Sequence, residues 1–95
     1  MKYCVGVMTV TLHLPASHSL KERRSVVNSL KEKISNRCNV SILEQGAETW
    51  QIAELAFAVV TETEPQGEEQ FRRVRDLIDM ETRLVALTPQ VEYYV

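Results

Sequence analysis

The alternation of two sets of side chains over residues 2–14 constrains the fold more than any other feature of the chain. Every second residue of this run is apolar or small, which is typical of a β-strand with one face against a core. Pro15 ends the run, because proline has no N–H to donate to a sheet. The residues predicted to face the core are Cys4, Gly6, Met8, Val10, Leu12 and Leu14.

A helical period replaces this alternation after Pro15. Ser19 and Glu22 form the pattern of a capping box, in which the serine hydroxyl accepts from the N–H of Glu22 and the Glu22 carboxylate reaches back to the amide of Ser19. We therefore expect a helix from about Leu20 to Asn36. Its apolar side is predicted to hold Leu20, Val27, Leu30 and Ile34, with Val26 beside them.

The rest of the chain adds two strands, a helix and a last strand. The almost wholly apolar run 55–60 is typical of a central strand. Pro89 predicts an edge position or a bulge. Phe71, Val74, Leu77 and Ile78 predict the inner face of the second helix. The expected elements are a strand over Cys38–Gln45, a turn over Gly46–Thr49, a strand over Trp50–Thr61, a helix from Thr63 to about Thr82, and a strand over Leu84–Val95.

The order β-α-β-β-α-β predicts an α+β domain of the ferredoxin-like, split βαβ kind. Ninety-five residues fit one such domain, spanning residues 1–95. We expect a four-stranded antiparallel sheet with the first and third strands in the centre. Both helices would cover one face and leave the other face open.

The distribution of charge, the two cysteines and the lack of long apolar runs indicate the cellular location of the chain. The net charge is −2, but residues 1–40 carry seven basic and two acidic side chains (+5), and residues 41–95 carry four and eleven (−7). Cys4 and Cys38 are expected to be buried small hydrophobes. No apolar run reaches the about 18 residues of a membrane span, and the N-terminus lacks the pattern of a signal peptide. We therefore expect a cytoplasmic protein.

Several short motifs of the chain are similar to those of one bacterial family. They are Ser19-Leu20-Lys21-Glu22-Arg23-Arg24 with its continuation to Ser41, Trp50-Gln51 followed by Ala53-Glu54-Leu55, and Gly6-Val7. With them the chain resembles the YlxP-like family, also called domain of unknown function 503. The resemblance implies the ferredoxin-like fold and a cytoplasmic location. It also implies a role near RNA or the ribosome, because the family's genes often neighbour those for translation initiation and ribosome maturation. It supplies no catalytic residue.

The first helix is one candidate binding surface. Lys21, Arg24 and Lys31 are predicted to share a face, with Arg23 and Arg37 near its ends. Such a set could bind the phosphates of RNA or of a ribosomal subunit. Glu32 dilutes the set, and an ordinary solvated helix is the alternative.

The open face of the sheet is the other candidate. Its predicted residues include no aromatic side chain, which argues against base stacking of the RNA-recognition kind. They are Val5, Val7, Thr9, Thr11, Glu54, Ala56, Ala58 and Val60. Small and β-branched side chains suit a protein contact, so we expect a homodimer; the alternative is a monomer with a mildly apolar sheet. The predicted interface residues are Val7, Thr9, Trp50, Ala56 and Ala58.

Enzyme and metal chemistry find little support in the sequence. Glycine-rich phosphate loops and a nucleophile elbow are absent, and His13 and His18 match no metal-ligand spacing. We expect no catalytic residue, no metal and no cofactor. Two functions stay open: an RNA- or ribosome-associated accessory protein, and a small-ligand-sensing or structural dimerisation domain.

Overall fold

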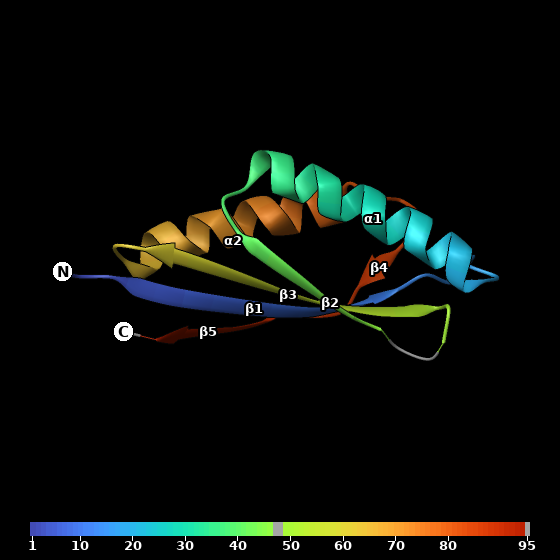
Figure 1. Ribbon diagram of the computed structural model, residues 1–95, viewed down its shortest axis with the longest axis horizontal. Coiled ribbons are helices and arrows are strands. Elements are labelled where there is room, and N and C mark those ends of the chain that lie inside the picture. The colour runs from blue at the N-terminus through green and yellow to red at the C-terminus, as the bar shows by residue number, and fades with distance from the viewer. Residues whose placement is uncertain (47–48, 95) are drawn as a thin grey trace.

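The computed structural model of the chain describes residues 1–46 and 49–94. Two helices lie against one face of an antiparallel sheet, in the ferredoxin-like arrangement (Figure 1). The sheet order is β2-β3-β1-β4, and β5 also pairs with β1. The elements in chain order are β1 (Cys4–His13), α1 (Leu20–Arg37), β2 (Ser41–Gly46), β3 (Ile52–Thr61), α2 (Glu64–Asp79), β4 (Val85–Ala86) and β5 (Gln90–Tyr94).

The two central strands are β1 and β3, as the sequence predicts. They pair over their whole length, from Cys4 opposite Thr61 to His13 opposite Ile52. Both strands alternate in burial, because successive side chains of a strand point to opposite faces. The predicted core set of β1 is buried, so the alternation in the sequence identified the correct face.

The last strand is divided, which differs from the single strand predicted over residues 84–95. β4 pairs with Leu12 and His13, and β5 pairs with the stretch of β1 from Val5 to Thr9. Residues 87–89 lie opposite only two residues of β1, so one residue is extra at this point. Pro89 is in this interruption at the sheet edge, as its missing N–H predicts. Val95 lies outside the described residues.

Helix α1 begins where predicted, but its first turn differs in two details. The Ser19 hydroxyl accepts from the N–H of Glu22 at 3.1 Å, as expected. The Glu22 carboxylate instead accepts from the N–H of His18 at 2.6 Å, so the prediction of a bond to the Ser19 amide is wrong. Leu20 is 39% exposed, and the buried side of the helix starts one turn later, at Arg23.

Helix α2 begins at a complete capping box. The Thr63 hydroxyl accepts from the N–H of Gln66, and the Gln66 side chain accepts from the N–H of Thr63. Pro65 lies in the first turn, where the missing N–H costs no helical bond. Gly6 lets α2 approach β1 closely, because a Cβ there would lie 2.9 Å from Cε2 of Phe71.

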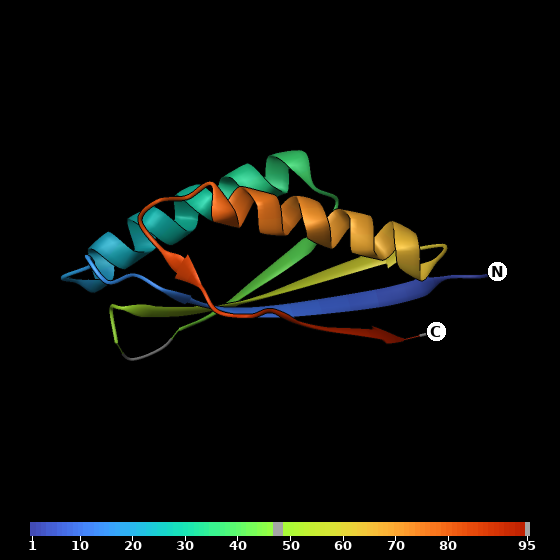
Figure 2. The same cartoon turned by 180° about the vertical axis from the view of Figure 1, so that it is seen from behind.

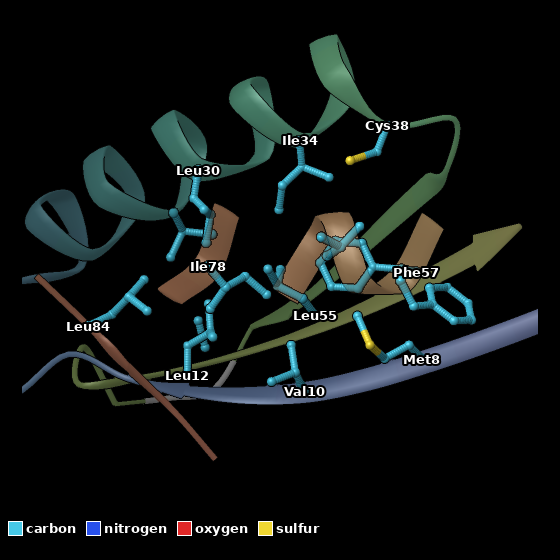
Figure 3. Close-up of a cluster of buried hydrophobic side chains, with 14 of the residues drawn as sticks. Met8, Val10, Leu12, Leu30, Ile34, Cys38, Leu55, Phe57, Ile78 and Leu84 are labelled. Atoms are coloured by element: carbon cyan, nitrogen blue, oxygen red, sulfur yellow. The ribbon is translucent and has the colours of Figure 1, made fainter. Parts of the chain in front are cut away.

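The core fills the space between the helices and the sheet (Figure 3). Phe57, Phe71 and Met8 are its largest fully buried side chains. Cys4 and Cys38 are both buried free thiols, as expected. Cys38 caps α1 through its N–H to the carbonyl of Ile34, so β2 starts at Ser41 and not at Cys38. The turn predicted over Gly46–Thr49 includes residues 47 and 48, which lie outside the described residues.

Candidate interaction surface

One face of the sheet is left open by the helices. Within the described residues both helices lie on the same side, and the opposite side faces solvent (Figures 1 and 2). The strand register places open-face residues of neighbouring strands side by side in rows. Three successive rows are Val60, Val5 and Tyr94; Ser41, Ala58, Val7 and Glu92; and Leu43, Ala56, Thr9 and Gln90.

These rows expose apolar side chains that a covered sheet would bury. Val60 is 65% exposed, Leu43 56% and Tyr94 55%. All eight residues predicted to lie on the open face are half-buried or exposed, so their placement is confirmed. The edge residues Leu43 and Tyr94 extend the surface beyond the two strands from which it was predicted.

The middle of the open face is hollow. Its concavity has a volume of about 370 Å³. The central strands contribute small side chains there, such as Ala56 and Thr9, while the edges contribute the longer Leu43 and Gln90. Short side chains between long ones make the surface concave. This hollow was not predicted from the sequence, because the alternation of the two central strands does not show which edge residues lie beside them.

The five predicted interface residues are only partly brought together. Val7 and Ala58 are cross-strand partners, and so are Thr9 and Ala56, which makes two adjacent rows. Trp50 precedes β3, beyond the last β1–β3 pair, and is 45% exposed. It therefore lies at the end of the sheet and not among the other four.

The structure corrects the predicted role of Arg23. This side chain is only 5% exposed, so it does not belong to an accessible basic surface. Its Nη1 donates to the carbonyl oxygens of Thr49 and Ile52, at 3.1 Å each. The guanidinium thus joins α1 to the turn before β3. The spacing of Arg23 from Val27, Leu30 and Ile34 was the signal that could have shown this.

The other four basic residues predicted to bind RNA differ in their surroundings. Lys31 Nζ lies 3.2 Å from Glu44 Oε1 of β2, so its charge is partly compensated. Lys21 and Arg24 are exposed near the start of the helix, and no described residue forms an ion pair with either. Arg37 is exposed 13 residues after Arg24, about 20 Å along the helix axis.

Other polar side chains join α2 to β5 or pair within the connection after α2. The Tyr93 hydroxyl donates to Glu68 Oε2 at 3.1 Å, and the same carboxylate pairs with Arg75. Burial, followed by this bond to Glu68, raises the pKa of Tyr93 to about 12. Arg83 donates through Nε and Nη2 to Glu81, and these bonds lower the pKa of Glu81 to about 2.

The described residues show no arrangement typical of a metal site. They contain no group of three or more histidine, cysteine or acidic side chains placed to hold an ion. His13 and His18 are exposed, at the end of β1 and in the loop after it. Burial raises the pKa of the Cys38 thiol, although Arg73 and Arg37 oppose the shift. That change favours the neutral thiol over the reactive thiolate.

Two helices on one side of a β2-β3-β1-β4 sheet, with the other side open, define a ferredoxin-like α+β domain. The chain belongs to a family of proteins of unknown function, DUF503, which it matches over residues 5–90. The uncharacterized protein YlxP of Bacillus subtilis (strain 168) is 32% identical over 77 residues, which cover 80% of this chain and 84% of the relative. The family resemblance seen in the sequence is therefore confirmed.

Solved structures support the fold alone. The de novo designed protein Foldit4 has a TM-score of 0.55 at 10% identity, and the match covers 99% of this chain and 98% of that one. A second design, LFR1 1 with ferredoxin fold, has a TM-score of 0.52 at 14% identity, with 96% and 87% covered. Neither of the described helices is long and apolar enough to cross a membrane.

Proposed function

We propose that this protein is a non-enzymatic binding domain that pairs with a second copy of itself through the open face of its sheet. The observation that supports this proposal is the uncovered apolar face, with Val60, Leu43 and Tyr94 each more than half exposed. A sheet normally packs such a face against another layer. A second copy offers the same surface, and identical patches can meet across a two-fold axis.

The size of the face suits a stable pair. The two central strands have ten residues and are about 33 Å long, the edge strands are shorter, and four neighbouring strands are about 19 Å wide. Two such faces together would bury on the order of 1,000 Å², about the least that is expected of a specific interface.

The charge of the face favours a protein partner over a nucleic acid. Its strand positions carry the acidic residues Glu54 and Glu92 and no lysine or arginine. The Glu92 carboxylate accepts a hydrogen bond from the Tyr94 hydroxyl. Phosphate groups would meet negative charge here, whereas the apolar rows around Val7 would be buried by a second copy.

Analytical sedimentation over a range of concentrations tests the pairing. We expect a dimer of the wild type at high micromolar concentration and a dissociation constant at least about tenfold higher for Val7→Lys, because pairing would have to bury the added charge and the longer side chain between two packed sheets. Asn28→Lys adds the same charge on the exposed side of α1 and should leave the dimer intact. A wild-type monomer at that concentration, or equal weakening by both variants, would contradict the proposal.

A second candidate function is contact with RNA or a ribosomal subunit in the cytoplasm. It is favoured by Lys21 and Arg24, which are exposed and form no ion pair with a described residue. Co-sedimentation with ribosomal subunits at low and moderate salt tests it. Salt-sensitive association that a Lys21→Glu/Arg24→Glu variant loses would support this function, and no association at either salt would contradict it.

A further inference from the structure

The hollow in the open face has the size and the chemistry of a ligand site. Its volume of about 370 Å³ lies within the roughly 300–1,000 Å³ of small-molecule pockets. Ala56 and Leu43 supply apolar surface. The hollow is open to solvent on one side in a single chain, and a second copy packed on the sheet would cover that side.

The polar side chains around the hollow are available to a ligand. Six of them line it, from four different strands or their ends, and none makes a hydrogen bond to another described residue. They offer three hydroxyl groups, two amides and one carboxylate. They are Thr9, Thr11, Thr88, Gln45, Gln90 and Glu54.

The charge of the lining selects the class of ligand. Glu54 is the only charged side chain that lines the hollow among the described residues. A carboxylate attracts a protonated amine and repels an anion, and it accepts a strong, charge-assisted hydrogen bond from an ammonium group. The hydroxyl and amide groups can satisfy further polar atoms, and Leu43 and Ala56 suit an apolar part.

We infer that this hollow binds a small organic cation, an amine with a short apolar part, with its ammonium group on Glu54. The inference rests on the proposed function in one respect: the second copy closes the site and excludes water from it. Binding would then couple to pairing, because the ligand would bind the dimer more tightly than the monomer.

Three compounds that carry the same isopentyl group test the selection by charge. They are isopentylamine, a cation at neutral pH; isopentanol, which is neutral; and 4-methylpentanoate, an anion. We would titrate each into the ¹⁵N-labelled full chain and follow the backbone amides by NMR. The amine should shift the amides of Thr9, Thr11 and Ala56 with saturation, the alcohol should bind more weakly, and the anion should cause no saturable shift. Equal binding of amine and anion would overturn the inference.

A matched pair of variants tests the role of Glu54. Glu54→Gln keeps the shape of the side chain and removes its charge, so the affinity for the amine should fall about tenfold. Glu62→Gln removes an acidic charge in the β3–α2 connection, outside the hollow, and should leave the affinity unchanged. If both variants bind the amine as the wild type does, or if both lose affinity equally, the amine is held by general surface charge and the inference fails.

The oligomeric state of the wild type separates the two proposals. If a second copy closes the site, the affinity for the amine should rise with protein concentration as the dimer forms. A wild-type dimer that does not bind the amine overturns the ligand site and leaves the pairing intact. A wild-type monomer that binds the amine through Glu54 supports the ligand site and overturns the pairing.

Discussion

Arg23 shows how one side chain can change role between sequence and structure. Its neighbours in the sequence are charged, yet its position one turn before Val27 places it on the buried side of α1. The side chain can be buried there because it is long enough for its guanidinium to donate to the carbonyl oxygens of Thr49 and Ile52. A buried charge is tolerated where backbone acceptors satisfy it.

Replacing Arg23 should therefore destabilise the fold and not merely change its surface charge. For Arg23→Met we expect a loss of about 2 kcal/mol in the free energy of unfolding, because two carbonyl groups lose a charged donor. Arg24→Met, at the next and exposed position, should change it by less than about 0.5 kcal/mol. Urea unfolding followed by circular dichroism measures both. Equal stability of the two variants would show that the contacts of Arg23 do not stabilise the fold.

At the scale of the elements, hydrogen bonds between nearby residues stabilise the connections between helices and strands. Glu81 follows α2, and its carboxylate accepts from the backbone N–H of Arg83 at 3.0 Å as well as from the guanidinium. The Glu81 side chain is only 7% exposed, while that of Arg83 is 51% exposed. The hydrogen bonds between Glu81 and Arg83 thus stabilise the turn that leads from α2 towards the edge strand.

The lowered pKa of Glu81 makes the stability that this carboxylate contributes depend on pH. Its pKa in the folded chain is about 2, below its ordinary value of 4.5, so its contribution is fully present above pH 4.5 and is lost as the pH falls towards 2. Because Arg83 is half exposed, we expect this contribution to be on the order of 1 kcal/mol. Glu81→Gln should be less stable than the wild type at pH 6 by that amount, and almost equal to it near pH 2.

Unfolding by urea at a series of pH values measures this difference. Glu32→Gln is the control, because Glu32 is exposed on α1 and forms no ion pair with a described residue. The control should follow the wild type at every pH. If the free energies of unfolding of the wild type and Glu81→Gln differ as much near pH 2 as at pH 6, the ionised Glu81 carboxylate does not stabilise the turn.

At the scale of the whole molecule, the chain builds one layer of helices and one sheet, and nothing described covers the second face of that sheet (Figure 2). The described elements are all used in these two layers, so none of them is left for a third. Pairing of two open faces would supply that layer from a second copy. The divided edge strand at Pro89 limits growth of the sheet at its β4–β5 side, because a broken edge pairs poorly.

Local periods in the sequence determined most of this architecture. Alternation in β1 and β3 and the helical repeats of α1 and α2 specified the elements and the buried face of the central strands. These patterns are readable because each side chain's direction follows from its own backbone. The open-face residues were predicted correctly for the same reason.

Contacts between distant segments were decided only by the tertiary structure. The burial of Arg23 depends on the turn around Thr49, about 26 residues further along the chain, and the pairing of Lys31 with Glu44 depends on how α1 lies over β2. The hollow needs side chains from β1, β2, β3 and the edge segment around Thr88 at once. No local period in the sequence predicts such contacts, because they arise from the packing of whole elements.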